Sequence, residues 1–118
     1  NYLQRMLTPV NIEWQVNTIG TLEKKLSPVY TLHLFRIVQE VTQNIIKHAE
    51  AKQVEYAFNT DGQNLRICIT DNGKGFDAEN AAANNGLKNI QHRTDEMNGT
   101  CNIHSSDAGT RVELTIKI

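Results

Sequence analysis

The stretch DNGKGF, residues 71–76, directly follows the alternating run LRICIT, residues 65–70. Alternation of apolar and polar residues in that run predicts a strand. Two glycines one residue apart, Gly73 and Gly75, lack the Cβ atoms that would keep a ligand away from the backbone. Asp71, at the strand end, can therefore direct a carboxylate into the space that the glycines leave. Taken alone, the stretch is also typical of a solvent-facing turn.

A long helix is predicted upstream of this strand. Ser27 and Pro28 combine a capping hydroxyl with a proline at the first helical position, which predicts a helix start. Apolar residues then recur at spacings of three and four as far as residue 49 or 51, the period of an amphipathic helix. The predicted core face contains Leu34, Phe35, Val38, Val41, Ile45 and Ala49. A polar stripe on another side of the helix contains Arg36, Glu40, Asn44 and Lys47, with His48 at its edge.

Period-two alternation predicts the strands of the domain. These strands cover residues 10–17, 54–58, 65–71, a short segment around Ile103, and 112–118. A second helix is expected between Gly86 and Asn98. Residues 77–85 lack an apolar period and are expected to form a mobile loop. The order strand, helix, hairpin, helix, hairpin predicts an α/β protein of the two-layer α+β type, with helices on one face of a mixed sheet.

Size and composition indicate a single domain, residues 1–118. The 118 residues, of which 39% are hydrophobic, are enough to bury one core without disulfides or a structural metal. A formal net charge of -1 gives no electrostatic footprint for nucleic acid or an anionic membrane. Cys68 and Cys101 are expected to be reduced thiols in a cytoplasmic protein. No apolar run is long enough to span a membrane, so direct membrane contact is not expected.

Several common nucleotide and metal motifs are absent or weak. The phosphate-loop pattern does not occur. Residues 73–78 match the dinucleotide pattern G-x-G-x-x-A, but no apolar stripe follows for the helix which that motif requires. Gly73 and Gly75 stand where a calcium loop would place oxygen ligands. Cys101 and His104 fall on opposite faces of a predicted strand, which favours a core thiol and a surface histidine over a zinc site.

The polar stripe of the long helix is a candidate magnesium and phosphate platform. Glu40 and Asn44 are one helical turn apart, a spacing also typical of a solvated face with local hydrogen bonds. An amide oxygen is a neutral ligand for Mg2+, and a nearby carboxylate can polarise a water or hydroxyl. With Asp71 and a helix N-terminus at Gly86, these residues favour one nucleotide bound between the long helix and the predicted loop.

Four segments resemble the sequence boxes of sensor histidine kinases. Residues 36–49, RIVQEVTQNIIKHA, resemble the N box of the class that ends in Lys-His-Ala. Residues 71–76 resemble the first glycine box of the family, and residues 85–90 resemble the second. Residues 109–114 resemble the closing Gly-Thr strand, and all four segments follow the family's order. The chain is therefore identified as an ATP-binding catalytic domain of this family. The resemblance implies the Bergerat fold, shared with type II topoisomerases, mismatch-repair ATPases and a heat-shock chaperone ATPase.

The resemblance also implies roles for matching residues at the base of the nucleotide. Asp71 would accept a hydrogen bond from the exocyclic amine of adenine, a contact that the O6 atom of guanine could not make. Gly73 and Gly75 would let the backbone approach the ring, with Phe76 in the same box. Thr110 would support the Asp71 carboxylate or its water.

At the phosphate end, the resemblance implies ATP with Mg2+ as the bound cofactors. Asn44 would be the magnesium ligand and Glu40 the candidate base. Four further residues would lie near the phosphates, the last two through backbone N–H groups at a helix N-terminus: Lys47, His48, Gly86 and Leu87. Asn84 replaces the first glycine of the second glycine box, which would weaken phosphate contact there.

The implied chemistry is γ-phosphoryl transfer to a histidine on a separate dimerisation domain, with a response regulator downstream. Residues 1–9 are a candidate remnant of the linker from that domain. All four histidines fall inside the catalytic domain, so this chain is expected to bind ATP without autophosphorylating. Two alternatives remain open from the sequence. They are an ATP-dependent conformational switch of the same superfamily and an interaction module that has lost nucleotide binding.

Overall fold

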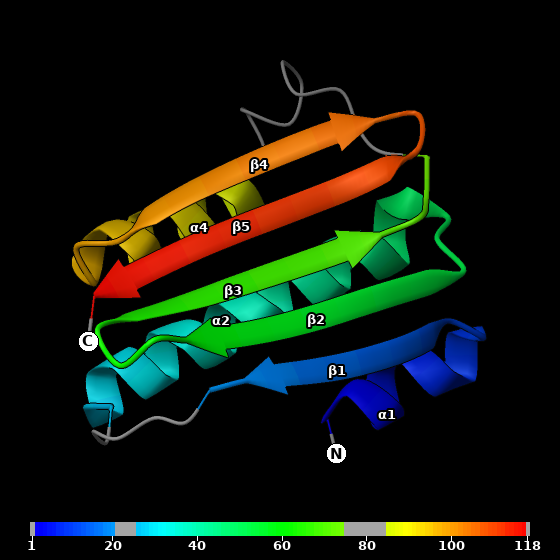
Figure 1. Ribbon diagram of the computed structural model, residues 1–118. Helices are drawn as coiled ribbons and strands as arrows, with labels where there is room; N and C mark the ends of the chain where they lie inside the picture. The colour runs from blue at the N-terminus through cyan, green and yellow to red at the C-terminus, as the bar shows by residue number, and fades with distance from the viewer. Residues whose placement is uncertain (1, 21–25, 75–84, 118) are drawn as a thin grey trace.

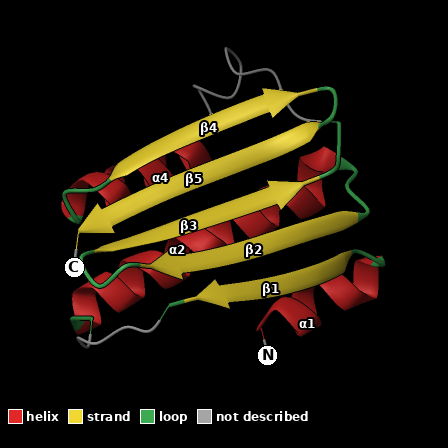
Figure 2. Ribbon diagram, viewed as in Figure 1, coloured by secondary structure: helices red, strands yellow, loops and turns green. Residues whose placement is uncertain are grey.

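The computed structural model describes residues 2–20, 26–74 and 85–117, which form a sheet covered by helices on one face (Figure 1). The helices are α1 (Tyr2–Leu7), α2 (Pro28–Asn44) and α4 (Asn85–Glu96), with the short turns η1 (Thr8–Val10) and η2 (Ile45–Ala49). The strands are β1 (Glu13–Ile19), β2 (Gln53–Thr60), β3 (Asn64–Asp71), β4 (Thr100–Ser106) and β5 (Gly109–Lys117). Figure 2 shows the same two layers by element type, and the predicted fold class is confirmed.

The five strands form one mixed sheet in the order β1-β2-β3-β5-β4. β1 pairs with β2 in parallel, as expected when α2 connects them, and the other pairings are antiparallel. The two predicted hairpins, β2 with β3 and β4 with β5, are therefore confirmed. Because β5 lies between β3 and β4, the last residue of β3, Asp71, is paired with Thr110 near the start of β5.

The first strand begins later than the predicted residue 10. Residues 8–10 form the η1 turn, and Asn11 adopts a left-handed conformation at φ 59°, so the extended chain starts at Glu13.

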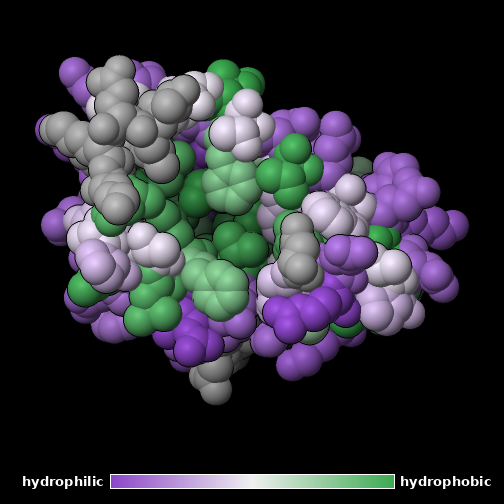
Figure 3. All heavy atoms as spheres, turned by 90° about the horizontal axis from the view of Figure 1, so that it is seen from below, coloured by the Kyte–Doolittle hydropathy of each residue, from purple (hydrophilic) through white to green (hydrophobic). Residues whose placement is uncertain are grey.

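β1 is an edge strand, and its Val16 remains 42% exposed. Figure 3 shows hydrophobic side chains gathered on the face seen from below. Among the described residues, the large hydrophobic side chains that remain exposed are those of Val10, Val16, Ile19, Val29, Leu32 and Phe35.

Helix α2 starts as the sequence predicts. The side chain of Ser27 accepts a hydrogen bond from the backbone N–H of Tyr30 at 3.1 Å, and Pro28 occupies the first turn. The helix changes at its other end, because residues 45–49 form a π-helix instead of continuing the α-helix. Glu50 then ends the helical segment in a left-handed conformation at φ 51°.

The core face of α2 is displaced by part of a turn from the predicted one. Leu34, Val41 and Ile45 are buried as expected, but Phe35 is 45% exposed and Ile37 is only 1% exposed. Phe35 instead contacts the ring of Tyr2 in α1 edge to face, with centroids 5.7 Å apart. The placement of Phe35 in the core was therefore wrong, since α1 offers its ring a partner outside the sheet.

The core lies between the sheet and helices α2 and α4. Its most deeply buried side chains include Ile37, Tyr56, Ile69, Ile90, Met97, Leu114 and Ile116. α4 starts at Asn85, and the chain leaves it through Asn98, left-handed at φ 54°, and Gly99, whose N–H donates to the carbonyl of Thr94. The predicted end of this helix is confirmed. The predicted loop lies outside the described residues as far as residue 84.

Candidate functional site

Asp71 ends β3 with its side chain buried, only 5% exposed. Ile67, Ile69 and Asp71 alternate on the buried face of the strand, so the carboxylate shares the side of the sheet that the helices cover. The backbone N–H of Gly73 donates to Oδ1 of Asp71 at 2.8 Å. Burial raises the pKa of this carboxyl, and the backbone N–H groups of Gly73 and Thr110 oppose that rise. A buried acceptor is therefore held in a defined orientation.

Gly109 brings β5 close to the end of β3. Its φ is 135°, and a Cβ on Gly109 would overlap the backbone carbonyl oxygen of Asp71. Next to it, Thr110 is buried and its hydroxyl lies 3.2 Å from Oγ of Ser105. The group of Thr110 that lowers the pKa of the Asp71 carboxyl is its backbone N–H. The Gly-Thr pair thus supports Asp71 through the backbone.

Asn72 has a structural role that the sequence did not reveal. Its Oδ1 accepts hydrogen bonds from the backbone N–H groups of Lys52 and Gln53, both at 2.9 Å. Its own N–H donates to the carbonyl of Gln53 at 3.2 Å. These three bonds join the end of β3 to the start of β2. The tendency of asparagine side chains to bond nearby backbone in turns was the available signal, but it does not identify a partner twenty residues away.

The polar stripe of α2 lies near the same ends of the strands. Figure 1 shows the C-terminal end of α2 and the end of β3 on one side of the molecule. Glu40 and Asn44 are half-buried, whereas Arg36 and Lys47 are exposed, and Arg36 donates to Gln39 at 3.1 Å. Burial raises the pKa of Tyr2 in α1, and the Glu40 charge adds to this rise.

The π-helix η2 moves Lys47 away from the position that a regular α-helix would give it. Glu40, Asn44 and Lys47 form one stripe if every turn of the helix has 3.6 residues. The α-helix keeps this spacing up to Asn44, but the π-helix η2 has more residues per turn. Of the predicted phosphate contacts, the side chain of His48 is outside what the structure describes.

Helix α4 presents its N-terminus to the remaining part of the site. Gly86 lies in its first turn and Leu87 is half-buried against the core. The first N–H groups of a helix have no partner within the helix and favour an anion. α4 is held beside α2 by a 3.1 Å contact between Nη1 of Arg93 and Nδ1 of His33. Gly75, Phe76 and Asn84 lie outside the described residues.

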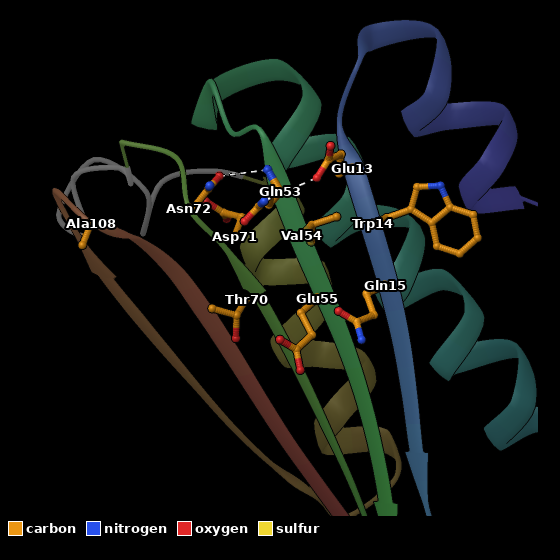
Figure 4. A pocket seen from close by; sticks show the side chains of 10 residues that line it. All are labelled: Glu13, Trp14, Gln15, Gln53, Val54, Glu55, Thr70, Asp71, Asn72 and Ala108. Carbon is orange, nitrogen blue, oxygen red and sulfur yellow. Dashed lines mark hydrogen bonds between the residues drawn. The ribbon is translucent and has the colours of Figure 1, made fainter.

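A hollow of about 390 Å³ lies on the open side of the sheet, away from the helices (Figure 4). Gln15, Glu55 and Thr70 point into it from three neighbouring strands. Glu13 also lines it, so two exposed carboxylates would repel a triphosphate. Asp71 also borders this hollow, but its side chain lies on the same face of β3 as Ile67 and Ile69. The candidate nucleotide site is therefore the helix side, where Asp71 is buried.

Comparison with known proteins identifies the family. The model of the family described as histidine kinase-, DNA gyrase B-, and HSP90-like ATPases matches residues 30–118. The chain belongs to this family. It is 32% identical over 116 residues to the sensor histidine kinase LiaS of Bacillus subtilis, covering 97% of this chain and 31% of LiaS. The chain therefore spans about a third of the length of that relative.

Solved structures agree on the fold of this family member. The histidine kinase AdeS of Acinetobacter baumannii matches with a TM-score of 0.80 at 14% identity, covering 98% of this chain and 59% of that one. Full-length ShkA, solved in complex with AMPPNP, matches with a TM-score of 0.78 at 18% identity, covering 98% and 27%. At these identities the likeness concerns the fold alone.

The described residues contain neither a membrane-spanning helix nor a cluster of metal-ligating side chains. No helix there is long and apolar enough to cross a membrane. No group of three or more His, Cys, Asp or Glu side chains in that part of the chain could hold a metal ion.

Proposed function

We propose that this chain is the ATP-binding catalytic domain of a sensor histidine kinase and that Asp71 reads the adenine. The observation that carries the proposal is the buried carboxylate of Asp71, oriented by the N–H of Gly73 at 2.8 Å, at the strand end beside α2. A fixed acceptor suits the amine of adenine and rejects the carbonyl oxygen of guanine at the same position. Family membership and the AMPPNP bound to a protein of the same fold support this proposal.

The residues of α2 fit a magnesium ion that the nucleotide shares. Asn44 is half-buried on the polar side of the helix, and its amide oxygen is a suitable hard ligand. Mg2+ bound with few protein ligands usually takes the rest from phosphates and water. When bound, the ion would neutralise phosphate charge.

The protein's own groups would position ATP and stabilise charge. The N-terminus of α4, at Gly86 and Leu87, would direct N–H groups to the phosphates, with Lys47 and His48 of the Lys-His-Ala segment nearby. Glu40 would accept a proton from the attacking imidazole or polarise its N–H bond. The γ-phosphoryl group would pass to a histidine on a dimerisation domain of the parent protein, and from there to a response regulator.

Calorimetry with ATP and Mg2+ tests the adenine-reading role. The chain is expected to bind ATP more tightly than GTP, and Asp71→Asn is expected to weaken ATP binding by about tenfold or more. Asp95→Asn is a matched control, because Asp95 is exposed on α4 and bonds only to Gln91 of its own helix among the described contacts. Equal ATP affinity in the parent chain and Asp71→Asn would overturn the role of Asp71.

A further inference from the structure

A buried hydrogen bond links the N-box helix to the middle of the sheet. Oγ1 of Thr42 lies 2.7 Å from the hydroxyl oxygen of Tyr56, and both residues are fully buried. Thr42 belongs to the last turn of α2 and Tyr56 to the centre of β2. Burial raises the pKa of the Tyr56 hydroxyl to about 12, so it takes part in this hydrogen bond as a neutral group.

The two partners lie next to the two ends of the candidate nucleotide site. Thr42 is two residues from both Glu40 and Asn44, just before the helix changes to a π-turn at Ile45. Tyr56 is paired with Ile69, two residues before Asp71, and the Asp71 charge contributes to its raised pKa. The hydrogen bond therefore connects the helix that carries Asn44 with the strands that carry Asp71.

This contact constrains the helix in a way that its apolar neighbours do not. Ile37, Val41 and Ile45 pack on the sheet through contacts without directional preference. A shift of α2 along the sheet could keep such contacts but would leave the hydroxyls of Thr42 and Tyr56 buried without partners, which is costly. The hydrogen bond thus selects one position of the helix against the sheet.

We infer that Thr42 and Tyr56 are positioning residues that hold Asn44 at the right distance from Asp71, so that one Mg-ATP engages both. The inference rests on the proposed function. It predicts that loss of the bond uncouples the magnesium end of the site from the adenine end. The quantity that reports this coupling is the ratio of the ATP dissociation constant in EDTA to that in Mg2+.

The experiment compares this ratio, by calorimetry, in the parent chain and four variants. Thr42→Val and Tyr56→Phe each remove one hydroxyl with little change of shape, and the double variant leaves no orphaned partner. Thr94→Val is the matched control, because Thr94 is also fully buried but bonds to the carbonyl of Ile90 in its own helix. Its hydroxyl also bonds to the Cys101 side chain on β4, so Thr94→Val removes a buried contact between another helix and the sheet. The link between α2 and β2 stays intact.

The ratio is expected to fall by about tenfold in each pair variant and in the double variant, with ATP affinity in EDTA little changed. It is expected to stay at the parent value in Thr94→Val. If the double variant is folded by circular dichroism and keeps the parent ratio, the bond is only a stabilising contact and the inference is overturned. If the parent chain itself binds no ATP, the proposed function fails and the inference fails with it.

Discussion

The N–H of Gly73 and the Oδ1 atom of Asp71, 2.8 Å apart, form a hydrogen bond inside the turn that ends β3. The bond orients a carboxylate that is almost fully buried. Its surroundings nevertheless raise the pKa of the Asp71 carboxyl, because desolvation exceeds the effect of the backbone donors. The ionised carboxylate of Asp71 therefore lowers the stability of the folded domain. Such a cost is common where binding function and stability compete.

The raised pKa predicts that Asp71→Asn is not destabilising at neutral pH. A carboxyl with a raised native pKa supports folding below its ordinary pKa of 3.8, and this support is lost as the pH rises through the native pKa. At pH 7 the parent chain thus carries a penalty that the neutral amide lacks. Thermal unfolding should give Asp71→Asn an equal or higher Tm at pH 7, and the difference should shrink toward pH 4. A markedly lower Tm at pH 7 would contradict this account.

Asn72→Ala should destabilise the domain by about 1–2 kcal/mol, because the N–H groups of Lys52 and Gln53 lose their shared acceptor. Urea unfolding measures the loss. Asn72→Asp keeps an acceptor at this position and should recover most of it. Asn102→Ala, an exposed substitution on β4, is the control and should change stability by less than about 0.5 kcal/mol. Equal effects of the two alanine variants would refute the bridging role of Asn72.

Gly109→Ala should be more harmful than Gly62→Ala. Both glycines have positive φ, so alanine is strained at either site, by about 1–3 kcal/mol. A Cβ on Gly62 meets no atom within 4 Å, whereas one on Gly109 overlaps the carbonyl of Asp71 and must displace it. We expect Gly109→Ala to lose ATP affinity as well as stability, and Gly62→Ala to lose only stability. The prediction fails if both variants bind ATP like the parent chain.

Asn44→Asp, made in the full-length parent protein, should impair phosphotransfer more than folding. The new carboxylate adds negative charge beside the phosphates and changes the ligand that the proposal assigns to Mg2+. Autophosphorylation, followed with labelled ATP, should fall by about tenfold or more. Asn102→Asp makes the same chemical change on an exposed part of β4 and should leave the rate unchanged. Unaltered phosphorylation of Asn44→Asp would remove Asn44 from the metal site.

Local patterns in the sequence were enough to predict most of the fold. The capping hydroxyl of Ser27 and the alternation in β2 and β3 act over a few neighbouring residues, so the helix start and the hairpin could be predicted correctly. The four segments that resemble the sequence boxes of sensor histidine kinases indicated the family. The end of the second hairpin strand at Asp71 was also predicted, because a strand followed by two glycines is visible without any tertiary contact.

The tertiary structure decided what depends on partners far apart in the chain. It turned Phe35 outward against Tyr2, widened the helix after Asn44, and paired Thr42 with Tyr56. A periodic pattern specifies that a helix has an apolar face, but the shape of the packed neighbours decides the rotation of that face and whether its last turn stays regular. The sequence by itself thus determined the order of the elements, the start of α2 and the family. Only packing determined how the helix and the sheet lie relative to one another.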